Sequence, residues 1–164
     1  RVRHDRQHDR PRPPAQRRRD QKGGGDEAIG RSRGGLSTKI HALVDALGDP
    51  TGFALSPGQA HDLEGADALL PDVAAAAPIA DKAFDAEERV LRRLAQAGRT
   101  AVIPPKANRK EARAYDKDLY EARHLIENFF AKLKQYRAIA TRYDKRAVHF
   151  LGAIHLAAAV VWLN

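Results

Sequence analysis

Four side chains that could act on a phosphate group recur at helical spacing between residues 115 and 137. Tyr120, Arg123, Glu127 and Lys134 project into a sector roughly 60° wide when each residue turns the helix by about 100°. One carboxylate between two cations and a phenol is what a metal-dependent phosphate site on a rigid helix would need. The alternative is an amphipathic helix whose polar boundary carries ordinary charge pairs three and four residues apart.

The apolar residues of the same stretch predict one long helix that positions those side chains. They fall on one broad face, as expected of a helix packed on a core. This face comprises Leu119, Ala122, Leu125, Ile126, Phe129, Phe130, Leu133 and Tyr136. The predicted helix over residues 115–137 therefore carries its acid at the edge of the core.

Asp81 is a second candidate acid, because it follows the short apolar run Ala77–Ala80 and precedes a predicted helix. In α/β sheets, ligands collect beyond the carboxyl ends of strands. A turn or capping role is the ordinary alternative for a lone Asp in such a connection. Asp85 and Glu88 have the spacing of a capping box for the following helix, which Gly98 closes, so we interpret Asp85 as a cap.

The spacing from Tyr120 to Lys134, Tyr-x2-Arg-x3-Glu-x6-Lys, resembles the signature of the DDE transposases of bacterial insertion sequences. The resemblance extends from about Gly30 to the C-terminus. Its other blocks are GRSRGGLSTKIHALVDALGDP, GQAHDLEGADALL, ADKAFDA, AVIPPKANRK and IATRYDKRAVHFLGAIHLAAAVVWL. We therefore expect residues 35–164 to form a DDE transposase catalytic domain that is incomplete at its N-terminal end.

The resemblance implies an α/β fold of the ribonuclease H-like type, a mixed sheet with packed helices. In that family two aspartates and one glutamate hold two Mg²⁺ or Mn²⁺ ions. Asp81 and Glu127 match the second and third acids, which makes them the implied metal ligands. By the same match Lys134 would face a phosphate, Arg123 would sit against the acid or the DNA backbone, and Tyr120 would orient one of them.

The activity implied by the resemblance is metal-dependent cleavage and joining of DNA strands at insertion-sequence ends. The implied partners are double-stranded DNA, as element ends and as target, and a second copy in a homodimeric complex. Because no residue matches the first acid, we predict that this chain does not cut or join DNA. The competing interpretations are a non-enzymatic basic nucleic-acid-binding module and a pseudogene product.

Residues 1–34 differ in composition from the rest, being rich in Arg, Pro, Gly and His and poor in aliphatic residues. We expect a disordered basic arm, able to bind a DNA backbone.

Reverse translation of residues 4–20 with a one-base offset can give TTDSTIVRAHQHSAAG. This translated sequence resembles the strand that carries the first acid in the DDE transposases and that has no match in this chain. We hypothesise out-of-frame translation, with the lost Asp codon across Arg6 and Gln7 and the frame restored between Gln21 and Glu27. The nucleotide sequence tests this.

Composition favours a polyanionic partner, because 29 Lys and Arg against 21 Asp and Glu give a net charge of +8. Ribosome-like or membrane-surface binding would give a similar balance. The absence of cysteine excludes disulfides and thiolate metal sites and fits a reducing, cytoplasmic compartment. The N-terminus lacks the apolar segment of a signal peptide, and Phe150–Leu163 is too short to span a bilayer. A chain that begins at Arg1 without methionine is expected to be a fragment or a processed product.

The remaining elements follow from alternation and turn residues. Alternating apolar residues from Lys39 predict a strand, joined to FALSPG by a hairpin across Gly48–Gly52. Asp62 is expected to cap a helix that runs to about Val73, although His61 and Asp62 might instead approach the site. Ala101–Ile103 predicts a further strand that two prolines stop. The last helix is expected to supply core from Val148, Leu151, Ile154, Leu156, Val160, Val161 and Trp162, with Ala157–Ala159 permitting close packing.

Ten cations are candidate DNA contacts, solvated surface charge being the default explanation for each. They are Arg31, Arg33, Lys39, Lys82, Lys106, Arg109, Lys110, Lys132, Arg137 and Arg142.

Overall fold

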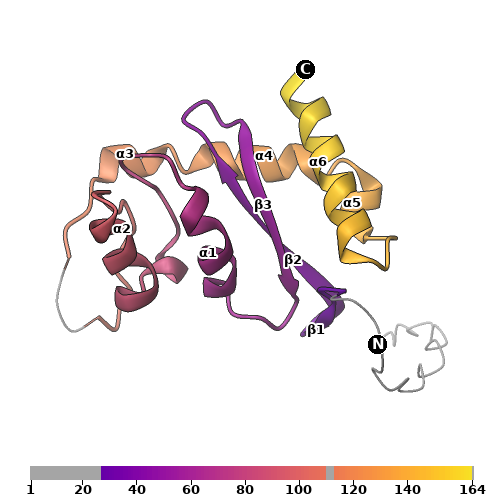
Figure 1. The fold of residues 1–164 in the computed structure, drawn as a ribbon, viewed down its shortest axis with the longest axis horizontal. Coiled ribbons are helices and arrows are strands. Elements are labelled where there is room, and N and C mark those ends of the chain that lie inside the picture. Colours follow the sequence, from indigo (N-terminus) through magenta and orange to yellow (C-terminus); the bar gives the residue numbers. More distant parts are fainter. Residues whose placement is uncertain (1–26, 110–112, 164) are drawn as a thin grey trace, which may run out of the picture.

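The computed structural model describes residues 27–109 and 113–163, and shows a small antiparallel sheet with helices on both faces (Figure 1). The strands are β1 (Gly30–Ser32), β2 (Gly35–Val44) and β3 (Pro50–Pro57), which lie in the order β1-β2-β3. The predicted class, an α/β chain with helices packed on a sheet, is confirmed at this level.

The β2–β3 hairpin is the centre of the sheet, and its turn lies where the sequence predicted it. Pairing runs from Thr38 opposite Pro57 to Val44 opposite Pro50. The Asp45 carboxylate accepts hydrogen bonds from the amides of Leu47 and Asp49, at 2.8 and 2.9 Å. This local network closes the turn, as Asp side chains commonly do. The strand itself begins at Gly35, earlier than the predicted Lys39.

The expectation of a disordered arm over residues 1–34 is wrong for its last part. β1 pairs with the start of β2, Gly30 lying opposite Ser37. Ala28 is only 4% exposed, and the Thr38 hydroxyl donates to its carbonyl oxygen at 2.6 Å. Composition misled here because this short strand contributes main-chain hydrogen bonds, which glycine and arginine supply as well as aliphatic residues do. Residues 1–26, on which the frameshift hypothesis depends, lie outside the described residues.

The helices form two layers around the hairpin (Figure 1). One layer contacts β3 and β2 through α1 (Leu63–Leu69), which continues as a 3-10 turn over Leu70–Asp72. The other layer comprises α4 (His124–Leu133), α5 (Arg137–Thr141) and α6 (Ala147–Leu163). Between α1 and α4 the chain forms a 3-10 turn (Lys82–Phe84), a π-helical turn (Glu87–Leu91), α2 (Arg92–Gln96) and α3 (Lys117–Glu121).

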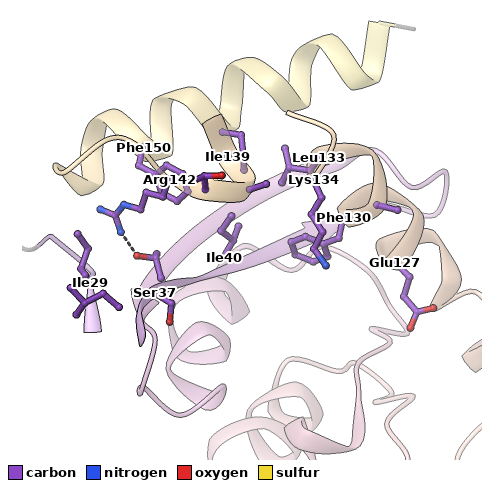
Figure 2. Close-up of a pocket in the computed structure, with 15 residues that line it drawn as sticks. Ile29, Ser37, Ile40, Glu127, Phe130, Leu133, Lys134, Ile139, Arg142 and Phe150 are labelled. Carbon is purple, nitrogen blue, oxygen red and sulfur yellow. Dashed lines mark hydrogen bonds between the residues drawn. The ribbon is translucent and has the colours of Figure 1, made fainter. Parts of the chain in front are cut away.

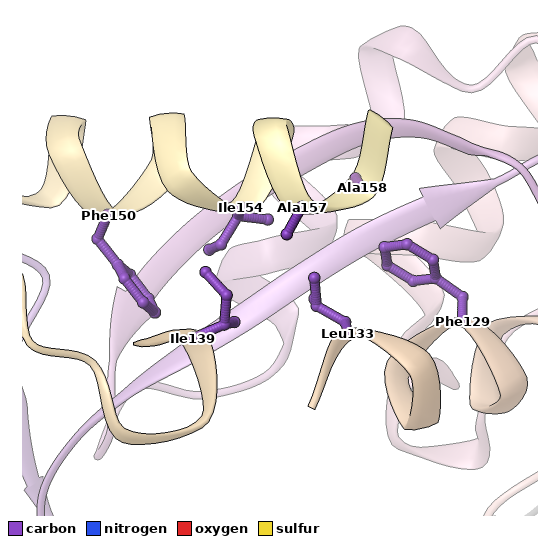
Figure 3. Packing of buried hydrophobic residues seen from close by; sticks show 7 residues of the cluster. All are labelled: Phe129, Leu133, Ile139, Phe150, Ile154, Ala157 and Ala158. Carbon is purple, nitrogen blue, oxygen red and sulfur yellow. The ribbon is translucent and has the colours of Figure 1, made fainter. Parts of the chain in front are cut away.

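The larger core lies between the hairpin and the α4–α6 layer (Figure 3). Its buried members are Phe129, Leu133, Ile139, Phe150, Ile154, Ala157 and Ala158. They pack on the inward residues of the hairpin, which include Ile40, Ala42 and Phe53. A second core joins α1, α2 and the strand-like residue Ile103, and contains the predicted helix residues Leu63 and Ala66.

The predicted core of α6 is only half correct. Ile154 is fully buried and Ala157 and Ala158 pack closely, but Val148, Leu156, Val160 and Trp162 are 69%, 70%, 40% and 61% exposed. The helix is apolar around its whole circumference, so periodicity could not identify the face that packs on the sheet. Within the described ranges, no helix combines the length and apolar character needed to cross a membrane.

The predicted helix over residues 115–137 is interrupted rather than continuous. The amides of Ala122 and Arg123 bond to the carbonyls of Leu119 and Tyr120, three residues back, which tightens the chain into a turn between α3 and α4. α4 then ends at Leu133. Phe129 and Leu133 are buried as predicted, whereas Leu119, before the break, is 47% exposed.

The two predicted strands at Ala77–Ala80 and Ala101–Ile103 are reduced to one parallel bridge between Ile79 and Val102. Val102 donates to the carbonyl of Pro78 at 2.9 Å, and Ala80 donates to the carbonyl of Val102 at 3.3 Å. Proline on either side of the bridge removes main-chain donors, so the ladder does not extend further.

Glycine at position 65 of α1 is predicted to be required by packing. A Cβ there would lie 2.1 Å from Nδ1 of His41, whose ring is held by a 2.8 Å hydrogen bond to Ser56. We expect Gly65→Ala to destabilise the fold by about 1–3 kcal/mol, because overpacking outweighs the gain in helix propensity.

Gly152 of α6 has open space around its Cβ position, so Gly152→Ala should stabilise the fold by roughly 0.5–1 kcal/mol. Urea denaturation of both variants decides this, and equal shifts of the same sign would contradict it.

Candidate active site

Two acids distant in the sequence share one cation. The Arg123 guanidinium donates from Nη1 to Oε1 of Glu127 at 2.6 Å and from Nη2 to Oδ2 of Asp81 at 3.3 Å. Because both nitrogens belong to one planar group, the two carboxylates lie within roughly 8 Å of each other. The side chains of Asp81 and Glu127 are 45% and 57% exposed, so solvent and ligands can reach both.

The elements explain this convergence. Asp81 follows the Ile79–Val102 bridge and precedes the 3-10 turn at Lys82, whose amide it binds at 2.6 Å. Glu127 lies in the first turn of α4, which packs across the β2 side of the sheet. Arg123 occupies the turn between α3 and α4 and therefore projects towards both acids. The contact with Glu127 spans the four-residue spacing of a helical turn, whereas the contact with Asp81 joins the start of α4 to a segment 42 positions away.

Tyr120 packs beside the arginine. The Arg123 guanidinium carbon lies 6.0 Å from the centre of the Tyr120 ring, and Tyr115 meets the same ring edge-on at 5.5 Å. Burial raises the pKa of the Tyr120 hydroxyl, and the negative charges of Asp81 and Glu127 add to that rise against the opposing effect of Arg123. Tyr120 therefore stays a neutral phenol beside the arginine.

Lys134 follows the last residue of α4 and lines a pocket of about 990 Å³ together with Glu127 (Figure 2). The other walls come from the start of β2, from α4 and α5, and from the loop before α6. Figure 2 shows the Glu127 side chain of α4 and the Lys134 side chain just after it pointing to the same side. The four residues at transposase-like spacing thus form two groups: Tyr120, Arg123 and Glu127 in mutual contact, and Lys134 beside the adjoining pocket.

Comparison with known protein families identifies the family to which this chain belongs. A family model described as Transposase DDE domain matches residues 4–162. The chain belongs to the DDE transposase family. A Brucella ovis (strain ATCC 25840 / 63/290 / NCTC 10512) protein named "Putative transposase for insertion sequence element IS6501" is 40% identical over 130 residues, which cover 79% of this chain and 100% of that protein. No solved structure matches the chain.

Membership of the DDE transposase family implies the use of divalent metal ions, and the donor set can be tested against that. Among the described residues, no group of three or more His, Asp or Glu side chains is placed to hold an ion. The acids present are the pair Asp81 and Glu127, and both already bind Arg123, whose single positive charge offsets one of their two negative charges. Two hard cations need more oxygen donors than a pair of carboxylates supplies. The described residues of this transposase therefore do not fit the two-ion arrangement.

Three of the predicted DNA contacts have their side chains engaged within the transposase fold. Lys39 binds Asp62 and the carbonyl of Ala60, each at 2.7 Å. Arg109 pairs with Asp85 and Glu87. All the guanidinium nitrogens of Arg142 donate to carbonyl or hydroxyl oxygens. Lys110 lies outside the described residues, and the remaining candidates, Arg31, Arg33, Lys82, Lys106, Lys132 and Arg137, stay predictions.

Two capping predictions are wrong. Asp85 makes no hydrogen bond to the helix after it; its carboxylate, 2% exposed, accepts instead from the Lys106 amide at 2.8 Å and from Arg109. Asp62 pairs with Lys39, while Nδ1 of His61 accepts from the Leu63 amide at 3.2 Å. In both cases a cation from a distant segment binds the acid more strongly than a local amide does, and only the tertiary fold reveals that partner.

Proposed function

We propose that this chain is the catalytic domain of an insertion-sequence DDE transposase, of ribonuclease H-like architecture, in a copy that is catalytically impaired. Asp81 and Glu127 are its second and third acids. The observation that supports this is the shared guanidinium, which brings together two acids from separate elements at the β2 side of the sheet. The catalytic domain begins by residue 27, because residues 27–34 pair and pack with the rest.

The other residues of the group take positioning roles in this proposal. Arg123 holds the two carboxylates in register, and the Tyr120 ring restrains the arginine. Lys134, which lines the pocket together with Glu127, would meet a phosphate of a DNA strand. The exposed cations Arg31, Arg33, Lys82, Lys132 and Arg137 supply further contacts to the double-stranded DNA of element ends or target, with two copies acting together.

The proposed loss of catalytic activity follows from the number of carboxylate ligands available to a metal ion. In an intact family member a third carboxylate would help to hold the two ions, which would supply charge stabilisation of the attacking and departing oxygens. Among the described residues the pair has no third acid beside it. Hence Mg²⁺ or Mn²⁺ should bind weakly, and cleavage and joining of DNA should be lost.

The second candidate is a non-enzymatic nucleic-acid-binding module. The net charge of +8 favours it, as does the binding of both acids to Arg123 within the fold. In a module of this kind the acids would be structural, and DNA affinity would be salt-sensitive but indifferent to their removal.

Titration with Mn²⁺ separates the two candidates. We expect weak binding by the purified chain, reduced roughly tenfold or more in Asp81→Ala and in Glu127→Gln, because each removes half of the available carboxylate ligands. Glu121→Gln, an exposed acid on α3, is the matched control and should leave the affinity unchanged. Isothermal titration calorimetry measures all four proteins, with circular dichroism to confirm folding.

Equal Mn²⁺ affinity in all four proteins, with salt-sensitive DNA binding, would favour the module. A supercoiled-plasmid assay tests the proposed impairment directly. Mg²⁺-dependent nicking or strand transfer by the unmodified chain, abolished by Glu127→Gln, would overturn it.

A further inference from the structure

α6 exposes a hydrophobic surface on the side that faces away from the core. Of the nine large hydrophobic side chains that are exposed among the described residues, five lie on this helix. They are Val148, Leu156, Val160, Trp162 and Leu163. From Ala147 to Leu163 the helix contains no Asp, Glu, Lys or Arg. Apolar surface of this kind usually marks a site of interaction.

Five exposed residues form a narrow line along the helix, called here the α6 stripe. At about 100° per residue they fall within a sector of roughly 80°. The stripe comprises Val148, Gly152, Leu156, Ala159 and Leu163. It lies opposite the α6 residues that pack in the core (Figure 3), and α6 itself lies at the periphery of the fold (Figure 1). At 1.5 Å per residue the stripe is about 22 Å long, so a second helix can lie along it.

The order of side chains in the α6 stripe is self-complementary for two helices in antiparallel orientation. Val148 and Leu163 are equally distant from the centre of the stripe, so each would face the other across a two-fold axis. Gly152 and Ala159 are related in the same way. The two small residues allow the helices to approach closely near the axis, and the large residues fill the ends. Leu156 would meet its own counterpart beside the axis.

Gly152 is explained by such an approach rather than by packing within one copy. Among the described residues, no atom outside the neighbouring turns of α6 lies within 4 Å of a Cβ built at Gly152. Glycine lowers the stability of a helix, but it permits close approach of another backbone. Its place in the α6 stripe therefore suits a helix–helix contact.

The charges at the two ends of α6 favour the antiparallel orientation. Lys145 and Arg146 are exposed and directly precede the helix. The C-terminal end of a helix carries a partial negative charge. An antiparallel pair places the two cations beside that negative end of the other helix. A parallel pair would instead bring the cations of both copies together, and like charges repel.

A second copy of the chain suits the α6 stripe better than two other occupants. Residues 1–26 contain a single large aliphatic residue, Val2, and no aromatic residue, so their composition offers no apolar face. A helix that lies on a membrane carries Lys and Arg on its polar face, whereas the face of α6 opposite the stripe is buried in the core.

We infer that two copies of this chain associate through antiparallel pairing of their α6 stripes. A helix pair of this length buries roughly a few hundred Å² on each copy, less than the about 800 Å² per partner of a standard interface. The dimer is therefore weak and depends on protein concentration. The inference goes beyond the proposed function, because it names the surface that joins two copies and needs neither metal nor DNA.

Sedimentation equilibrium of the full chain in metal-free and DNA-free buffer tests the association. The average mass should rise from monomer towards dimer between about 1 and 500 µM protein. Leu156→Glu places two carboxylates beside the axis and should weaken the dimer about tenfold or more. Leu47→Glu is the matched control, because Leu47 is 81% exposed at the hairpin turn, and it should leave the dimer unchanged. Circular dichroism confirms that both variants fold.

Gly152→Leu separates a fitted interface from unspecific adhesion. The new side chain adds apolar surface, so it would strengthen unspecific adhesion. In the antiparallel pair it blocks the close approach and should weaken the dimer about tenfold or more. A strengthened association would overturn the inference.

Cysteine cross-linking tests the orientation, because the chain contains no cysteine. A mixture of Val148→Cys and Leu163→Cys proteins, oxidised with oxidised glutathione, should form a disulfide-linked heterodimer. Neither variant should link to itself to the same extent. Efficient self-linking of each variant without the heterodimer would show parallel pairing and overturn the inference.

The remaining outcomes distinguish this inference from the alternatives and from the proposed function. A monomer at every concentration overturns it, as does equal weakening by the Leu47 and Leu156 substitutions. A monomeric chain that floats with neutral phosphatidylcholine vesicles, and loses this binding in Leu156→Glu, would assign the stripe to lipid instead. Leu156→Glu should bind Mn²⁺ as the original chain does, so failure of the dimer leaves the proposed metal ligands untouched.

Discussion

Replacing Arg142 with alanine is expected to destabilise the folded chain by about 3 kcal/mol, since several hydrogen bonds from a charged group are lost and most of their acceptors are partly buried. The guanidinium connects the loop before α6 to the start of the sheet. Its acceptors are the carbonyl oxygens of Glu27, Ala28, Asp144 and Lys145 and the hydroxyl of Thr38. It also lies 4.7 Å from the centre of the Phe150 ring. Urea denaturation of the full chain measures the loss.

Two further substitutions separate the contributions at this position. Arg142 has a φ of +49°, so Arg142→Gly removes the same hydrogen bonds but relieves backbone strain. It should be milder than Arg142→Ala by about 1 kcal/mol. Arg142→Lys keeps the charge without the planar fork and should resemble the alanine variant. A lysine variant as stable as the original would show that charge alone suffices. If a fully folded Arg142 variant instead lost DNA affinity in a salt-dependent way, Arg142 would be a DNA contact as the sequence analysis predicted.

Replacing Asp85 with alanine is the second substitution expected to have a large effect, about 3 kcal/mol or more. The Asp85 carboxylate is 2% exposed and accepts from the Lys106 amide and from Arg109, with Arg113 3.7 Å away. Removing one partner of a buried ion pair leaves the others uncompensated. Arg113 has little capacity to adapt, because its Nε is already buried without a hydrogen-bond partner among the described residues.

The controls for Asp85 use the same network. Asp85→Asn keeps an acceptor for the Lys106 amide and should cost less than Asp85→Ala. Glu87→Gln removes the exposed partner of Arg109, 56% exposed, and should have little effect, since exposed pairs contribute little. Thermal unfolding followed by circular dichroism compares the three. If Asp85→Ala and Glu87→Gln shift the midpoint equally, the buried carboxylate is not the anchor of the 104–109 loop.

Local signals in the sequence predicted the elements that local interactions determine. The β2–β3 hairpin follows from alternation and from a Gly-Asp-Pro turn, and α1 from apolar residues at helical spacing. Two structural features were not predicted from the sequence, because they depend on contacts with distant residues. The helix over residues 115–137 breaks at Ala122 and Arg123, and α6 buries one side of an all-apolar helix. Neither the break nor the choice of face is encoded in periodicity.

In the candidate site, too, local spacing was predictive and contacts between distant residues were not. The spacing of Tyr120, Arg123, Glu127 and Lys134 identified residues that the fold gathers at one side of the sheet. Their roles in catalysis stay predictions. No sequence pattern indicated that Arg123 would bind Asp81, 42 positions away, or that Arg109 and Arg142 would donate to oxygen atoms of the chain itself. Pairing of distant charges is a property of the finished fold, and composition cannot locate it.

The shared Arg123 guanidinium also affects how the two acids are accommodated when no ligand is bound. Clustered carboxylates repel one another and usually make a protein depend on bound ions for its integrity. Here Arg123 binds both Asp81 and Glu127 and cancels one of their two negative charges, so the repulsion between the two acids is reduced when nothing is bound. An ion or a phosphate that engages the site therefore meets a contact that already holds the two acids, and its binding must displace or recruit that arginine.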